Sequence, residues 1–212
     1  MHRREMWGLV ASVVLLWAGC GGEVSPPPPP GTGRLSLTFS PTPPSATGLT
    51  LSKASVRVEQ MAVLGDVAPS DHTTLSETEL DMLGSARELW FDKVPQGLYS
   101  LIKFEVTRIE LQGEYREGSS DPKQLEGQIN LSAWANLRCP AGVEVAPDQV
   151  GLFGILIDGG HWFAGVPLEQ AQESDGQIKI DDQNNVAIGQ AIAANVVVSF
   201  ALGPPPAHVG PH

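Results

Sequence analysis

One short segment gathers residue types from which binding or catalytic sites are built. Asp158, His161 and Trp162 lie within five residues, and Asp158-Gly159-Gly160 separates an apolar run from the aromatic pair after His161. An Asp-Gly/Gly-Gly turn between apolar runs predicts a β-hairpin. Such a hairpin would bring a carboxylate, an imidazole and an indole together at one edge of a sheet.

This arrangement has two interpretations. In the first, the ring of Trp162 is exposed and stacks on a sugar, with Trp134 and Asn136 completing the platform. In the second, Trp162 or Phe163 fills the hydrophobic core and the hairpin is structural. The residue types and their spacing are compatible with both.

Carboxylates also gather at Asp181-Asp182, beside Asn184 and Asn185. Turn formation and helix capping account for such a cluster. A calcium loop would need Asp175 to join them through folding, and the EF-hand spacing of ligands is absent. We therefore predict no metal and no cofactor.

The sequence contains none of the common catalytic motifs: no P-loop, no GxGxxG, no GxSxG, no HExxH and no CxxC. A hydrolase acting through carboxylates is the enzymatic alternative, but no pair of carboxylates is distinguished by its spacing. We therefore predict a non-catalytic protein with no catalytic residue.

The N-terminus carries the strongest pattern. Arg3 and Arg4 precede an uncharged stretch from Met6 to Ala18, which ends in Gly19-Cys20. That stretch is shorter than the roughly 20 apolar residues of a membrane-spanning helix. A cationic start, a short apolar run and small residues at its end are typical of a cleaved export signal.

Ala18-Gly19-Cys20 resembles the lipobox of bacterial lipoproteins, although Trp17 replaces the usual leucine. The resemblance implies cleavage before Cys20, acylation of that cysteine and attachment to a lipid bilayer, which several acyl chains make stable. Gly21 is not the acidic residue that retains lipoproteins at the inner membrane, so the outer membrane is expected. The alternative is an ordinary signal peptide with a coincidental cysteine.

Composition limits the partners. The chain has 212 residues, a formal net charge of −11 and a pI near 4.8, which excludes a nucleic-acid-binding surface. An envelope protein or a glycan remains as the expected partner. With Cys20 acylated, Cys139 is alone, so no disulfide within the chain is expected. Cys139 is either a small buried residue, a reactive thiol or one half of an intermolecular disulfide.

Alternating apolar residues predict a mainly β domain, a single antiparallel β-sandwich of about eight strands. The alternating apolar residues lie at even positions up to Val106 and at odd positions from Ile109. Because a strand cannot change its buried face without an extra residue, this predicts a β-bulge near Thr107-Arg108. A capping box at Ser76–Glu79 and a cap at Asn185 predict two short helices, ending at Gly84 and Ala194. The expected strands lie at 35–39, 54–63, 88–92, 98–111, 127–132, 149–158, 161–166, 177–181 and 195–202.

The segment Glu79–Gly84, a short strand at 88–92 and Val94-Pro95-Gln96-Gly97-Leu98-Tyr99 before a long strand resemble an uncharacterised family of bacterial lipoproteins. Its domain is a carboxypeptidase-regulatory-like or transthyretin-like β-sandwich. The resemblance implies that fold and an envelope location. In the turn, Pro95 and Gly97 favour a type I geometry, and the Tyr99 hydroxyl can bond back to the turn.

Together these patterns predict four segments. Residues 1–19 form a lipoprotein signal peptide, and 20–33 a lipidated cysteine with a Pro/Gly-rich tether. Residues 34–202 form the β-sandwich, and 203–212 a disordered tail. The expected function is that of a membrane-anchored structural or binding module, with carbohydrate or calcium binding as the alternative.

Overall fold

The computed structural model describes residues 31–65, 73–75 and 77–204. Within these ranges the chain forms eleven strands, one α-helix and two short 3₁₀ helices. In chain order they are β1 (Thr32–Thr42), β2 (Leu49–Gly65), β3 (Thr73–Leu75), β4 (Thr78–Asp81), β5 (Arg87–Pro95), β6 (Gly97–Tyr115), β7 (Lys123–Val145), β8 (Val150–Asp158), η1 (Gly159–His161), η2 (Leu168–Gln170), β9 (Glu173–Ser174), β10 (Gln177–Ile180), α1 (Val186–Val198) and β11 (Phe200–Gly203).

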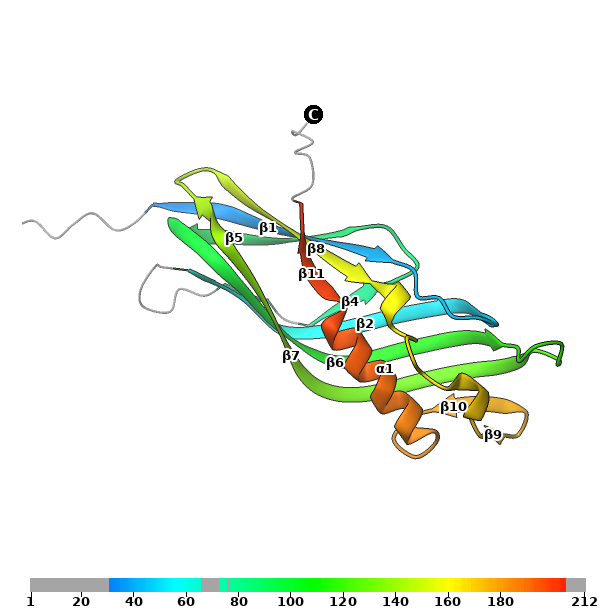
Figure 1. Cartoon of the computed structure of the whole chain (residues 1–212). Helices are drawn as coiled ribbons and strands as arrows, with labels where there is room; N and C mark the ends of the chain where they lie inside the picture. The colour runs from blue at the N-terminus through cyan, green and yellow to red at the C-terminus, as the bar shows by residue number, and fades with distance from the viewer. Residues whose placement is uncertain (1–30, 66–72, 76, 205–212) are drawn as a thin grey trace, which may run out of the picture.

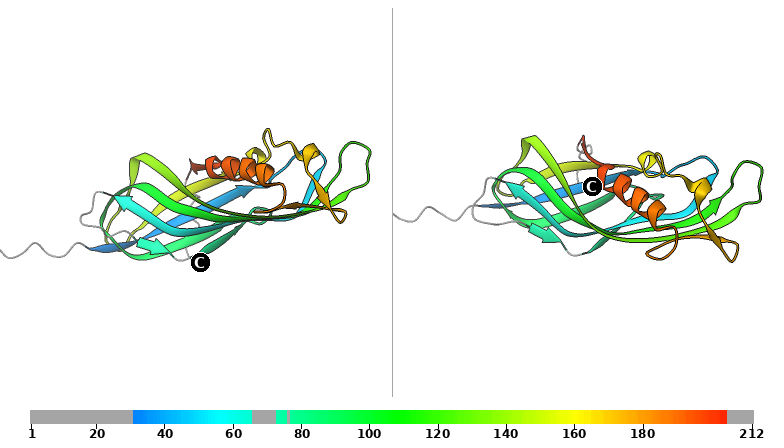
Figure 2. Two further views of the ribbon diagram at one scale, coloured as in Figure 1. Left: turned by 90° about the horizontal axis from the view of Figure 1, so that it is seen from below. Right: turned by 60° about the horizontal axis from the view of Figure 1, so that its bottom comes forward.

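The strands form two sheets that face each other (Figures 1 and 2). The smaller sheet has the order β11-β8-β1-β5, and the larger has the order β3-β2-β6-β7-β10-β9 with β4 paired to β2. Helix α1 packs on β7 and β10, where a Cβ on Gly189 would lie 3.2 Å from Ile180. The helix therefore covers part of the inner face of the larger sheet.

This architecture confirms the predicted mainly β, sandwich-like class, but the sheets are not purely antiparallel. β1 runs parallel to β8, and β7 runs parallel to β10. β7 ends at the larger sheet, and the chain crosses at 146–149 into the smaller sheet, where β8 aligns with β1 in the same direction. Such crossovers leave no signal in the alternation of a single strand.

The core lies between the sheets and is built from the inward residues of the long strands. Phe104, at the centre of β6, is fully buried and meets Phe39 and Phe200 edge to face, with ring centroids 6.0 and 4.9 Å away. The predicted bulge is confirmed, because the pairing of β6 with β2 shifts between Val106 and Arg108 and leaves Thr107 as an extra residue on β6. That shift lets both Val106 and Ile109 point inward.

The bend at Gln96, between β5 and β6, carries the contact expected of Tyr99. Its ring is buried, and its hydroxyl donates a hydrogen bond to the carbonyl of Pro95 at 2.8 Å. The Tyr99 side chain thus fixes the start of β6 against the residues that precede it.

Three predicted elements are wrong. The residues after the capping box form strand β4 instead of a helix, because they pair with β2 from Val58 to Ser55; Ser76 itself lies outside the described residues. Residues 161–166 form turns rather than a strand. The helix predicted after Asn185 is present, but the Asn185 side chain does not cap it. It continues to Val198 and takes over half of the strand expected at 195–202.

The domain boundaries shift slightly. β1 begins at Thr32 and β11 ends at Gly203, so the domain starts before the predicted residue 34 and ends after the predicted residue 202. The signal peptide, Cys20 and most of the predicted tail lie outside the described residues. Among the residues described, α1 is too short to cross a membrane.

Candidate functional site

The structure separates the four residues proposed from the sequence as a ligand face. Trp162 is completely buried, and its indole N–H donates a hydrogen bond to the Ser199 hydroxyl at 3.3 Å. Asn195, on α1, donates hydrogen bonds to the carbonyls of Trp162 and Ala164 at 3.1 and 3.0 Å. The interpretation of Trp162 as an exposed stacking ring is therefore wrong, and its role in the core is confirmed.

Asp158 and His161 stay close together at the surface. Nδ1 of His161 lies 2.7 Å from a carboxylate oxygen of Asp158, whose other oxygen accepts the N–H of Gly160 at 3.0 Å. The hydrogen bond with His161, aided by that of Gly160, lowers the pKa of Asp158. Both side chains are more than half exposed, and their contacts close the turn η1 after β8.

Trp134 lies on a different surface. It is 44% exposed, whereas the next residue, Ala135, is buried, so the indole stands on the outer face of β7. The ammonium of Lys103, on the neighbouring strand β6, lies 5.4 Å from the ring centroid. Since Trp162 lies inside the sandwich, the two rings do not form one platform.

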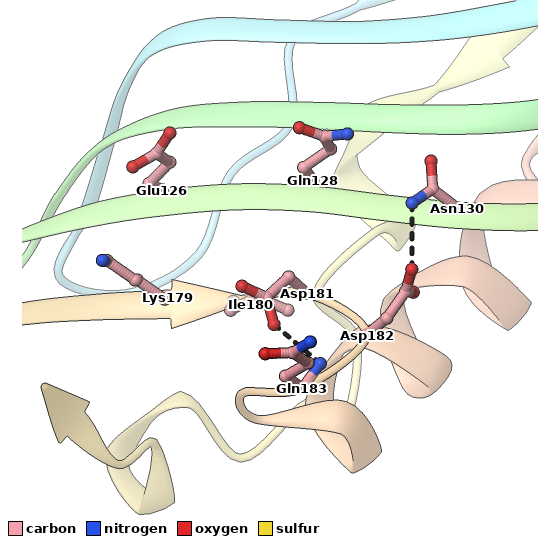
Figure 3. A pocket seen from close by; sticks show the side chains of 8 residues that line it. All are labelled: Glu126, Gln128, Asn130, Lys179, Ile180, Asp181, Asp182 and Gln183. Atoms are coloured by element: carbon pink, nitrogen blue, oxygen red, sulfur yellow. Dashed lines mark hydrogen bonds between the residues drawn. The ribbon is translucent and has the colours of Figure 1, made fainter.

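The outer face of the larger sheet is hollowed where β7 and β10 run side by side. The groove there has a volume of about 450 Å³ (Figure 3). Its floor and one side come from alternate residues of β7, and its other side comes from β10 and the turn after it. The lining residues are Glu126, Gln128, Asn130, Lys179, Ile180, Asp181, Asp182 and Gln183.

Internal hydrogen bonds fix the turn that forms the wall of this groove. One carboxylate oxygen of Asp181 accepts the N–H groups of Gln183 and Asn184 at 2.8 and 2.7 Å. These bonds, together with one from the Asn184 side chain, lower the pKa of Asp181, the N–H of Gln183 contributing most. The carboxylate is therefore ionised at neutral pH, and its hydrogen bonds hold the turn in place.

A second set of contacts joins the wall to the floor. The side-chain amide of Asn130 donates to Asp182 at 3.0 Å, and its oxygen accepts from Nε of Arg108 at 3.2 Å. Figure 3 shows Asn130 and Asp182 meeting at one end of the groove. The distance between β7 and the wall is thus set by polar contacts within the protein.

Four lining side chains are left available. Among the described residues, the side chains of Glu126, Gln128, Lys179 and Gln183 make no hydrogen bond or ion pair. They offer a carboxylate, an ammonium and two amides, so donors and acceptors face the same space. This arrangement suits the recognition of a ligand that itself carries many donors and acceptors.

The calcium alternative finds no support in the placement of its residues. Asp181 and Asp182 are held by their own hydrogen bonds, and no group of three or more His, Cys, Asp or Glu in the described ranges could hold a metal ion. Cys139 is half-buried, and within the same ranges it forms no disulfide, hydrogen bond or ion pair that would activate its thiol.

The sequence reasoning missed the groove. Polar residues at 124, 126, 128 and 130 alternate with apolar ones along β7, which marks an outward polar face. The opposite wall, however, comes from a strand about fifty residues later whose parallel pairing places Lys179 in register with Glu126. Only the tertiary fold brings the two halves together.

Comparison with known proteins gives no further assignment: no family model, no curated protein and no solved structure matches this chain.

Proposed function

We propose that this chain is a lipid-anchored exported protein of the bacterial outer membrane, whose β-sandwich is a non-catalytic binding module. The observation that carries the proposal is the order of features at the N-terminus. A cationic start, a short apolar run and Ala18-Gly19-Cys20 are followed by a Pro/Gly-rich segment, and β1 begins at Thr32. The folded domain thus starts twelve residues after the cysteine.

The binding role is supported by the surface of the larger sheet. The groove on β7 and β10 has fixed walls and lining groups without partners among the described residues. By contrast, the Asp158–His161 pair closes a turn, and Asp181 braces another. The carboxylates of Asp158 and Asp181 are therefore used in local structure, which favours a binding module.

The anchor is tested by the intact mass of the native protein extracted from membranes with detergent. We expect a chain beginning at Cys20 that carries the added mass of a diacylglyceryl group and an amide-linked acyl chain. Cys20→Ala should abolish this mass and leave the chain unprocessed or soluble. The matched control is Cys139→Ala, which removes the other cysteine and should leave acylation unchanged.

A mature chain that begins at Cys20 without acyl mass, or that is cleaved at another residue, would overturn the anchor. Catalytic turnover that is lost with Asp158→Ala or Asp181→Ala would overturn the non-catalytic role. These results are read separately, since the first concerns the N-terminus and the second the folded domain.

A further inference from the structure

We infer that the outer face of β7 and β10 is a binding surface for a neutral oligosaccharide, held in the groove and along the row of β7 that leads to Trp134. The inference rests on the proposed binding function and names the ligand class of that module. It is carried by the shape of the groove, by its unpartnered polar groups and by the exposed indole on the same strand face.

The groove has the size and the rigidity of a binding site. Its volume of about 450 Å³ falls within the range of small-molecule sites, roughly 300–1,000 Å³. The Asn130–Asp182 bond and the braced turn at Asp181 hold its walls in place without a ligand. A preformed site loses less conformational freedom on binding, which favours affinity for a flexible ligand.

The available groups match hydroxyls better than ions. Gln128 and Gln183 each offer a donor and an acceptor, as a sugar hydroxyl does. Three carboxylates and the ammonium of Lys179 line the space, so the groove is net negative and repels phosphates and acidic sugars. A small polycation, in turn, would be repelled by the ammonium of Lys179, which lines the same space and whose charge also acts on Asp181.

The exposed indole supplies the apolar contact that a sugar also needs. Trp134 stands on the same outward face of β7 as Asn130, four residues further along the strand. At 3.3 Å per residue this places it about 13 Å from the end of the groove. The C–H face of a pyranose ring can stack on the indole, whose negative ring face attracts polarised hydrogens.

The outer face thus presents two contacts of different kind, spaced along one strand. Lys103 is a flexible side chain whose ammonium lies beside the ring, so a ligand can displace it without a change in the backbone. An extended oligosaccharide is long enough to reach both contacts, whereas a monosaccharide can reach only one.

The test is a calorimetric titration of the detergent-solubilised full lipoprotein with maltotetraose, cellotetraose and mannotetraose. We expect at least one to bind. Gln128→Ala should weaken that binding about three- to tenfold, the effect of one lost hydrogen bond, and Trp134→Ala should weaken it by about tenfold or more. Gln128→Glu keeps the size of the side chain and removes its donor, so it should also weaken binding.

Matched controls lie on other surfaces. Trp90→Ala, on β5 of the smaller sheet, and Gln190→Ala, on an exposed position of α1, should leave the affinity unchanged. A thermal melt of each variant shows whether it is folded. If Gln128→Ala is unfolded, Gln128→Glu and Trp134→Ala still decide the question.

Three results would overturn the inference: no binding of any of the three sugars up to about 10 mM, binding that the groove and Trp134 variants do not alter, or binding of spermidine in the groove with no sugar bound. Spermidine binding would leave the binding module in place and change its ligand class. The acyl mass is measured on the same preparation, so a failed sugar titration is distinguishable from a failed anchor.

Discussion

Trp162 and Trp134 occupy opposite environments in this molecule. Trp162 follows η1 and is fully enclosed, with its N–H bonded to Ser199, while Trp134 stands 44% exposed on the outer face of β7. The first is bonded to Asn195 and Ser199, far along the chain, and the second contacts Lys103 of the neighbouring strand. The comparison shows that the tertiary contacts of an indole, more than the residues beside it in sequence, determine its role.

The difference extends to the surroundings of each ring. Around Trp162, polar atoms are satisfied by specific tertiary hydrogen bonds from Asn195 and Ser199. Around Trp134, the neighbouring groups are flexible or exposed, including Lys103 and Asn136. The interior therefore holds one indole for stability, and the outer face leaves the other open to contact.

The largest effect is expected at Trp162. Trp162→Ala should lower the free energy of unfolding by about 3–5 kcal/mol, because a buried aromatic is replaced by a cavity. Urea denaturation followed by circular dichroism measures the change. A midpoint close to that of the wild type would show that the two tryptophans do not differ as described.

Ser199→Ala should have the next largest effect. Ser199 is buried, accepts the indole N–H and donates to the carbonyl of Val196 at 2.7 Å. Removing the hydroxyl leaves the buried N–H without a partner, which costs about 1–3 kcal/mol. In the Trp162→Phe background, which lacks that N–H, Ser199→Ala should lower the free energy of unfolding by measurably less. Equal losses in the two backgrounds would rule out an energetic coupling between Ser199 and the indole.

Trp134→Ala should reduce stability by no more than about 1 kcal/mol. The ring is partly solvated, and its contact with Lys103 is an exposed cation–π pair, worth about 0.5–1 kcal/mol. Parallel urea curves for this variant and Trp162→Ala sharpen the comparison directly. A loss as large as that of Trp162→Ala would place Trp134 in the core and remove it from the proposed binding face.

The smallest effect concerns Asp158, at the turn that leads into Trp162. The folded state lowers its pKa, chiefly through the bond with His161. The stability this provides is therefore present above the ordinary carboxyl pKa and is lost as the pH falls through the lowered folded value. Both groups are more than half exposed, which limits the contribution to a few tenths of a kcal/mol.

Asp158→Asn should accordingly flatten the acid limb of the stability curve below about pH 4, measured by urea midpoints. Asn retains an acceptor for the N–H of Gly160, so the turn itself should persist. An acid limb as steep as that of the wild type would show that the carboxylate contributes nothing there.

Much of the sandwich could be predicted because its strands are long and their faces differ. In β6, Ile102, Phe104 and Val106 alternate with polar residues, and the reversal at Ile109 locates the bulge. The Tyr99 turn was predictable for a similar reason, since its partner lies only four residues away. Local patterns were sufficient wherever the decisive contact was local.

Predictions failed where a distant segment decided the structure. The residues after Asp158 look like the second half of a hairpin, but hydrogen bonds from Asn195 hold them in turns. The capping box before Leu80 predicted a helix, but pairing with β2 makes this segment a strand. The groove combines residues near 128 and near 180, and the parallel register that joins them is not encoded in either segment alone.

The position of β1 has a mechanical consequence. It is the first strand of the domain and also an interior strand, paired with β5 over 32–39 and with β8 over 34–42. A pull on residue 31 along the strand axis would load both ladders in shear, so many hydrogen bonds would have to rupture together. An edge strand pulled across its ladder would instead open one bond at a time. The proposed N-terminal anchor would apply force to the domain through both ladders of β1, and the lifetime of the fold under load would follow from the unfolding rate rather than from equilibrium stability.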